Sequence, residues 1–260
     1  MDALVAGGAT DRVEGLRDGE QELSPAHAKK KNELKPWRVE RFCIPPEKNA
    51  PFVSAMEDVL DVYQLPYDEM RPVVCFDETS KQLVGHARTP IPPRPGTAER
   101  VDDEYTREGT ANIFAAIEPI TGKALVQVTE RRTSIDTARF FKRLSDEVYA
   151  AATTILLVMD NLSTHSIACL YEAFPPAEAR RIARRFEIHH TPKHGSWLDV
   201  AEIFLSTMSI ECLDQRVPDA PTLRALVDAW LRSRKSGKVR WRFRAEDARI
   251  KLHRLYPSLP

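Results

Sequence analysis

The chain has 260 residues, 42% of them hydrophobic, which is enough for one sizeable core, so we expect one main domain with tails. Its 38 basic and 38 acidic residues cancel, so overall charge neither favours nor excludes a nucleic-acid partner, and the distribution of charge must decide. The four cysteines are scattered without a CxxC pair, which argues against a disulfide-built secreted protein and against a zinc site. No apolar run is as long as a membrane span, which argues against a membrane protein. Together these features favour a soluble cytoplasmic protein.

The N-terminal part of the chain is polar and then strongly basic. Residues 1–28 contain few large apolar side chains, so we expect them to be disordered or loosely helical. Residues 29–66 are expected to form a basic linker followed by a helix from 50 to 63, where apolar residues recur at helical spacing. The linker concentrates five cations, which suit either a phosphate-contacting segment or a solvated basic tail; they are Lys29, Lys30, Lys31, Lys35 and Arg38.

Two apolar runs that end in an acid are predicted to be buried strands. The first runs from 71 to 77 and ends at Asp77, after which we expect a turn and then a proline-rich loop from 89 to 109. The second runs from 154 to 160 and ends at Asp160. A carboxylate at the carboxyl end of a central strand lies where open α/β sheets bind their ligands, and it requires a cationic partner there.

The segments around these strands predict an α/β fold. Residues 113–117 and 124–128 are expected to form a hairpin, with Gly122 at the turn position that needs a positive φ. Thr133 to Asp136 is a helix N-cap signature, and short helices and one more strand, 186–192, follow. This order predicts a mixed sheet, first an antiparallel meander and then strands joined by crossovers, flanked by helices.

A helix predicted from 196 to 206 supplies a third acid. Its apolar positions form one stripe, namely Leu198, Ala201, Leu205, Met208 and Cys212. Asp199 and Glu202 fall together on the neighbouring polar face. Glu202 thus joins Asp77 and Asp160 in a set of hard oxygen ligands that suits Mg²⁺ or Mn²⁺, and two such ions can clamp the attacking and leaving oxygens of a phosphodiester.

Cations gather in two later segments. The arginines from 180 to 185 crowd so closely that they cannot all face a core, so Arg181, Arg184 and the nearby Lys193 are candidate DNA contacts. The tail, residues 216–260, is predicted to be helical to about residue 230. Arg240 and Arg242 then alternate with aromatic residues, which indicates either contact with a nucleic-acid backbone or a strand whose aromatic side chains lie in the core.

The three acids lie in three motifs that occur in a fixed order. The motifs are Val74-Cys75-Phe76-Asp77-Glu78, Met159-Asp160-Asn161-Leu162-Ser163-Thr164-His165 and His194-Gly195-Ser196-Trp197-Leu198-Asp199-Val200-Ala201-Glu202, with 82 and 41 residues between the acids. Together they resemble the catalytic domain of transposases of the insertion-sequence 630 type, relatives of the Tc/mariner elements. The resemblance runs from about residue 30 to the C-terminal tail and implies a DDE active site on an RNase H-like fold.

This resemblance implies a reaction and a set of partners. Two Mg²⁺ or Mn²⁺ ions would be bound by Asp77, Asp160 and Glu202. The enzyme would then nick the element ends with a metal-activated water, and the freed 3′ hydroxyl would attack target DNA. The partners would be double-stranded DNA and a second protomer, in the bacterial cytoplasm at the nucleoid. Residues 67–215 would be the catalytic domain and 29–66 the remnant of a DNA-binding region, so we expect an N-terminally truncated chain.

Four further residues lie near the acids, and three of them have more than one interpretation. Members of the group commonly carry Asn where this chain has Asp199, so Asp199 is either an outer metal ligand or a charge that faces water. Asn161 is expected to brace Asp160 by a hydrogen bond. His165 and His194 could contact the scissile phosphate, orient an acid, or only stabilise their turns.

Three other functions are open to these residues. A DNA-binding remnant without catalysis would compete for element ends. A glycosidase with two carboxylates would need aromatic platforms beside the acids, where this chain offers arginine. A hydrolase with Ser163, His165 and Asp160 as its triad is disfavoured because three residues of one loop can hardly point at each other. The motifs therefore favour metal-dependent DNA cleavage.

Overall fold

The computed structural model describes residues 48–162, 165–234 and 237–258. The predicted linker cations Lys29, Lys30, Lys31, Lys35 and Arg38, the segment 1–28, and Ser163 lie outside the described residues. No helix among the described residues is both long and apolar enough to cross a membrane.

The described residues form a five-stranded sheet of order β3-β2-β1-β4-β5. Its strands are β1 (Val73–His86), β2 (Tyr105–Ile117), β3 (Ala124–Thr129), β4 (Ile155–Met159) and β5 (Phe186–His190). β1, β2 and β3 pair antiparallel, whereas β1, β4 and β5 pair parallel. The predicted mixed sheet, a meander followed by crossover strands, is confirmed.

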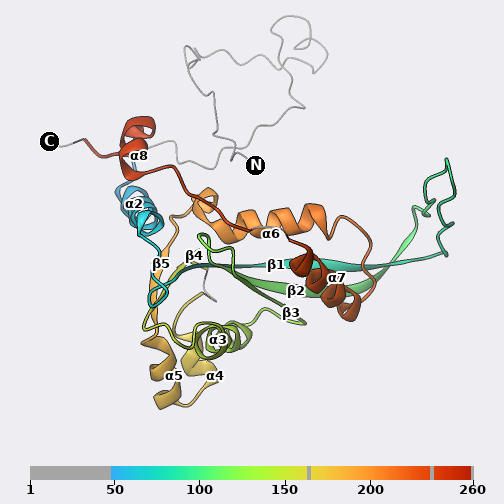
Figure 1. Ribbon diagram of the computed structural model, residues 1–260, viewed down its shortest axis with the longest axis horizontal. Helices are drawn as coiled ribbons and strands as arrows, with labels where there is room; N and C mark the ends of the chain where they lie inside the picture. Colours follow the sequence, from blue (N-terminus) through green and yellow to red (C-terminus); the bar gives the residue numbers. More distant parts are fainter. Residues whose placement is uncertain (1–47, 163–164, 235–236, 259–260) are drawn as a thin grey trace, which may run out of the picture. The chain divides into compact units, whose positions relative to one another are not determined.

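Helices cover both faces of this sheet (Figure 1). One face packs against α2 (Ala50–Gln64), α6 (Val200–Glu211), α7 (Ala220–Ser233) and α8 (Ala245–Lys251). The other face packs against α3 (Ser134–Arg143), the π-helical turn Leu144–Val148, α4 (Cys169–Ala173) and α5 (Pro176–Ala183). Alternate residues of β4 serve the two cores: Leu156 and Val158 face the first, and Leu157 and Met159 face the second, which is why the strand is an unbroken apolar run.

Several local predictions are confirmed by the backbone. Thr133 caps α3 in a capping box, in which its hydroxyl accepts from the Asp136 N–H at 3.3 Å and Asp136 accepts from the Thr133 N–H at 3.0 Å. Gly122 has φ +78° in the turn between β2 and β3. The apolar stripe predicted from Leu198 to Cys212 is buried throughout.

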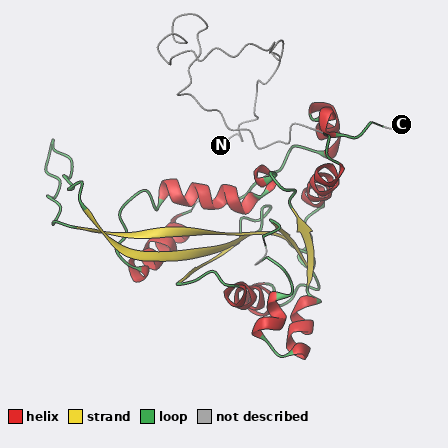
Figure 2. Cartoon of the chain, turned by 180° about the vertical axis from the view of Figure 1, so that it is seen from behind, coloured by secondary structure: helices red, strands yellow, loops and turns green. Residues whose placement is uncertain are grey.

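The predicted end of the first strand at Asp77 is wrong. β1 continues to His86 and stays paired with β2, which begins at Tyr105 inside the predicted loop. Figure 2 shows these two strands running on beyond the rest of the sheet. The apolar run stops at Phe76 because β4 stops at its partner Met159, and the later residues of β1 are buried only in part. The end of the apolar run therefore marks the point where β4 no longer pairs with β1, not the end of β1 itself.

The helix predicted from 196 to 206 begins later and runs further. Ser196–Leu198 is a single 3-10 turn, Asp199 has an extended conformation with φ −87° and ψ 111°, and α6 then continues to Glu211. Because Asp199 precedes the helix, its side chain does not follow the helical periodicity from which its position was predicted.

Candidate active site

The register of β1 and β4 places two of the predicted acids side by side. Phe76 of β1 pairs with Met159 of β4 in the parallel ladder, so Asp77 and Asp160 are the next residue on each strand. β4 ends there, whereas β1 continues, and Asp160 begins the loop at the carboxyl end of β4. Two acids 83 positions apart in the sequence therefore emerge at one edge of the parallel part of the sheet.

α6 brings the third acid to the same region. Glu202 lies in its first turn and is exposed. Together with Asp77 it lines a pocket of about 310 Å³, which Glu78, Thr79, Leu205, Ser206 and Ser209 complete. The structure thus unites Asp77 and Glu202 in one pocket and places Asp160 next to Asp77 in the sheet.

A buried histidine fixes Asp160. His165 is 1% exposed, and its Nδ1 contacts Asp160 Oδ1 while its Nε2 contacts Glu78 Oε2. The Leu162 N–H also donates to Asp160 Oδ1 at 3.1 Å. Burial alone would lower the pKa of His165, but its hydrogen bonds to Asp160 and Glu78 outweigh burial and raise it to about 9. The ring is therefore a cation at neutral pH, held between two carboxylates.

The two neighbouring aspartates respond to this environment in opposite directions. Burial would raise the pKa of Asp160, but the hydrogen bond and charge of His165 outweigh it, and the pKa lies below its ordinary value. For Asp77, burial and the nearby charges of Glu78 and Asp160 raise the pKa to about 7, although the Glu78 N–H donates to its Oδ1 at 2.8 Å. Burial and the two acidic neighbours of Asp77 thus outweigh the nearby charge of His165, which lowers its pKa.

Asp199 is buried, and the expectation that it lies on the polar face of α6 beside Glu202 is wrong. It is 2% exposed and caps α6, with Oδ1 accepting from the Ala201 N–H at 2.8 Å. Among the described residues its Oδ2 finds no hydrogen-bond partner. Burial, and then the charges of Asp77 and Glu202, raise its pKa well above the ordinary range.

The donor set fits a hard divalent cation in chemistry. Asp77, Asp160 and Glu202 are carboxylates, and the pKa of Asp77 is raised first by burial and then by repulsion from the charges of Glu78 and Asp160. One carboxylate oxygen of the buried Asp199 has no hydrogen-bond partner among the described residues. A bound cation would relieve this repulsion. In the described part of the chain, however, no three His, Cys, Asp or Glu side chains converge into a ready-made metal cluster, so the carboxylates would have to close around the ion.

The other predicted residues around the acids are mostly exposed. Asn161 is exposed directly after Asp160. His194 is exposed in a turn with φ +66°, beside the exposed Lys193. Arg184 is exposed at the C-cap of α5. None of these positions contradicts a contact with DNA, but only His165 is built into the acid cluster.

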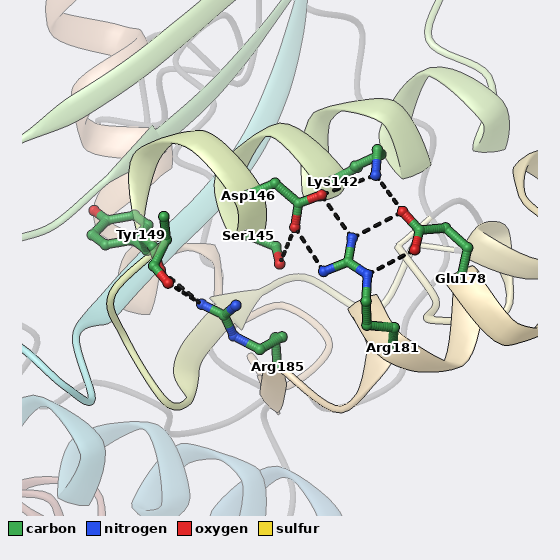
Figure 3. A network of polar contacts seen from close by, with 8 residues as sticks. Lys142, Ser145, Asp146, Tyr149, Glu178, Arg181 and Arg185 are labelled. Carbon is green, nitrogen blue, oxygen red and sulfur yellow. Dashed lines mark hydrogen bonds and ion pairs between the residues drawn. The ribbon is translucent and has the colours of Figure 1, made fainter.

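Arg181 has carboxylate partners of its own (Figure 3). Its guanidinium donates to Glu178 at 2.7 Å and to both oxygens of Asp146 at 3.0 and 2.7 Å, and Lys142 joins the same two acids. This network joins α5 to α3 and the π-helical turn, on the sheet face that α6 does not cover. The positive charge of Arg181 is thus largely balanced by Glu178 and Asp146 within the fold.

The aromatic and basic residues near the C-terminus separate onto two sides of an extended segment. Trp241 and Phe243 are partly buried and pack against the first core, where the Trp241 ring lies 5.1 Å from Tyr63 and 6.5 Å from Trp197. Arg240 and Arg242 alternate with them and are exposed. The rings are therefore core residues, while the cations remain open to solvent.

Glu78 and Arg132 also take part in the site; the sequence led us to expect that Glu78 caps a turn or contacts a basic residue, and it gave Arg132 no role. The Glu78 side chain is 3% exposed and lies between His165 and Arg132, whose Nη1 is 3.8 Å from Glu78 Oε1. Glu78 immediately follows Asp77, but its partners lie more than fifty residues away along the chain, so no local pattern could reveal them.

Comparison with known proteins agrees with this geometry. Residues 72–224, more than half of the chain, match the family model described as DDE superfamily endonuclease. The chain belongs to this family. No curated protein sequence matches it significantly.

Solved structures support the same fold for this member of the family. It is similar to the Mos1 strand transfer complex, with a TM-score of 0.53 and 13% identity over 88% of this chain and 65% of that one. It is also similar to the Mos1 transposase paired-end complex with the left transposon end, with a TM-score of 0.52 and 11% identity over 82% and 63%. The predicted RNase H-like fold is thereby confirmed, and the chain spans less than two thirds of the Mos1 chains.

Proposed function

We propose that this chain is the catalytic part of a transposase of the insertion-sequence 630 type, which cuts double-stranded DNA at element ends and joins it to target DNA. The observation that carries the proposal is the placement of Asp77 in β1 and of Asp160 directly after the adjacent strand β4, with Glu202 in the pocket that Asp77 lines. The order and spacing of the three motifs and the family match support it.

In this proposal Asp77, Asp160 and Glu202 hold two Mg²⁺ or Mn²⁺ ions, with Asp199 beside them. The similar Mos1 structures include a paired-end complex with Mn. When bound, such ions activate water and offset the negative charge of the scissile phosphate. His165 engages one oxygen of Asp160 and leaves the other for a ligand, and α6 sets the position of Glu202 at its first turn.

Exposed cations would hold the DNA backbone. Arg240 and Arg242 project from the extended C-terminal segment, and Arg184 and Lys193 are exposed elsewhere. Phosphate contacts of this kind give affinity without sequence readout and weaken as salt rises. We propose double-stranded DNA as the partner, and a homodimer as the arrangement that holds two ends.

A second candidate is a DNA-binding protein of the same fold that does not cleave. It is favoured by one observation: no three potential ligands converge among the described residues. In that case the exposed arginines would retain DNA affinity, and the acids would be unable to hold metal in the geometry that the reaction needs.

Nicking of supercoiled plasmid by the purified protein decides between the two. The proposal expects nicking that requires Mg²⁺ or Mn²⁺, stops with EDTA and is lost in Asp160→Asn. Asp228→Asn is a matched control, because it makes the same change at an exposed position of α7. Folded wild-type protein that binds DNA but does not nick it with either metal would instead support the non-cleaving alternative.

A further inference from the structure

The ring of His165 connects two acids that come from different strands. Asp160 follows β4, and Glu78 lies within β1, one residue beyond Asp77. His165 is 1% exposed and the Glu78 side chain 3%, whereas the Asp160 side chain remains 47% exposed. The bridge thus has a buried end at Glu78 and a solvent-accessible end at Asp160.

This bridge stands where backbone pairing between the two strands has ended. The ladder of β1 and β4 ends at Phe76 and Met159, so β1 offers no backbone partner at the level of Asp160. On the β5 side the Thr191 N–H still donates to the Met159 carbonyl at 2.9 Å, and His190 Nδ1 lies 3.2 Å from the Asp160 carbonyl, but neither contact holds the Asp160 side chain. The Phe76 ring meets the His165 ring edge-on at 5.0 Å and sets its plane. Arg132 closes the far end, 3.8 Å from Glu78. At this level the contacts of His165 with Asp160 and Glu78 connect the chain after β4 to β1, as backbone pairing does up to Phe76 and Met159.

We infer that Glu78 and His165 are positioning residues that hold the carboxylate of Asp160 in the orientation needed to bind a divalent cation. This inference rests on the function proposed above, because it gives Asp160 a ligand role. Neither residue is a catalytic residue in it: both act on the reaction through Asp160. Without the bridge, a half-exposed aspartate would sample several rotamers and would lose that freedom on binding the ion.

The magnitude follows from what such supporting contacts contribute elsewhere. Removing a hydrogen-bond partner of a metal ligand typically weakens metal affinity by about 10- to 100-fold. We expect His165→Asn to fall in this range, since it removes both contacts. Glu78→Gln should lie at its lower end, because the amide oxygen can still accept from Nε2 while the negative charge is gone.

The experiment measures Mn²⁺ binding by the full chain, through the electron paramagnetic resonance signal of free Mn²⁺, and plasmid nicking over a range of Mn²⁺ concentrations. We expect both variants to raise the Kd for Mn²⁺ and to recover much of the wild-type nicking rate when Mn²⁺ is saturating. Phe140→Leu is the control for stability, because Phe140 is 1% exposed in the same core and contacts Phe76. It should lower the melting temperature and leave Mn²⁺ affinity unchanged.

Two results would count against the inference itself. It is overturned if Glu78→Gln and His165→Asn bind Mn²⁺ as the wild type does, or if Phe140→Leu weakens binding as much as they do. Should His165→Asn fail to fold, Glu78→Gln alone decides. If the wild type neither binds Mn²⁺ nor nicks DNA, the proposed function itself fails, and that result is visible before any variant is compared.

Discussion

Replacing Asp77 by Asn is expected to stabilise the metal-free protein at alkaline pH, although it removes a residue of the proposed site. The pKa of Asp77 is raised from 3.8 to about 7, first by burial and then by the charges of Glu78 and Asp160. One pKa unit corresponds to about 1.4 kcal/mol, so the ionised carboxylate costs the folded state at most about 4 kcal/mol. Asparagine has nearly the same shape and no charge.

The sign of the pH dependence follows from the raised pKa. Folded Asp77 binds its proton more tightly than the unfolded chain does, so its contribution to stability is complete below about pH 4. It is lost as the pH rises through about 7, with roughly 3 kcal/mol of the loss between pH 5 and pH 8. Asp77→Asn lacks this loss, so the free energies of unfolding of the two proteins should diverge over that interval.

Urea unfolding in EDTA at pH 5 and pH 8 measures this difference. His165 and Asp160 titrate in both proteins, so most of their effect cancels in the comparison. Asp228→Asn, at an exposed position, should show a constant difference from the wild type over the same interval. A constant difference for Asp77→Asn as well would refute the claim that Asp77 is a desolvated, repelled carboxylate. Adding Mg²⁺ at pH 8 should stabilise the wild type more than Asp77→Asn, since only the wild type regains its counter-charge.

Three further predictions concern other parts of the chain. Asp199→Asn should keep metal-dependent nicking, and in thermal unfolding it should be more stable than Asp199→Ala by about 1 kcal/mol, because Asn can still cap α6. Loss of Mn²⁺ binding in Asp199→Asn would instead show that Asp199 is a metal ligand. Replacing Arg240 and Arg242 together by Ala should reduce the slope of log affinity for DNA against log salt by about 2, whereas Arg181→Ala, whose charge is paired within the fold, should leave the slope unchanged. Gly122→Ala should lower stability by about 1–2 kcal/mol in a thermal melt, since φ is +78° and a Cβ would lie 2.9 Å from a facing backbone carbon; an unchanged melting temperature would contradict this.

Much of the sheet could be predicted because its central strands are buried on both faces. The unbroken apolar run of β4 predicts a buried strand, and the acid that follows it correctly marks the carboxyl end of that strand. The continuation of β1 could not be predicted in the same way. Beyond Asp77 this strand pairs with β2 alone among the described strands, so most of its residues are polar or half-buried, and such a sequence resembles a turn followed by a loop.

The sequence allowed the candidate acids to be located and left orientation of an acid as one role open to His165, but it did not reveal the partners of that histidine. Asp77 and Asp160 could be recognised because each follows an apolar run, and Glu202 because it lies beside the apolar stripe of α6. The bridge from Glu78 to His165 joins positions 87 residues apart, and it depends on the register of two strands that sequence periodicity does not give. The burial of Asp199 was missed for a local reason, since a single extended residue before α6 breaks the helical phase.

The difference in length between β1 and β4 explains why the acids are where they are. If β4 continued beside β1, its backbone would cover the edge of Asp77, and Asp160 would be a strand residue with no freedom to face a pocket. Because β4 stops at Met159, one side of β1 is uncovered at the level of Asp77, and α6 places Glu202 over the resulting pocket. The same interruption removes the backbone hydrogen bonds that β1 would have made to Asp160, and the buried pair of Glu78 and His165 instead connects Asp160 to β1. Access to the acids and the need for a side-chain bridge are therefore two consequences of one structural feature.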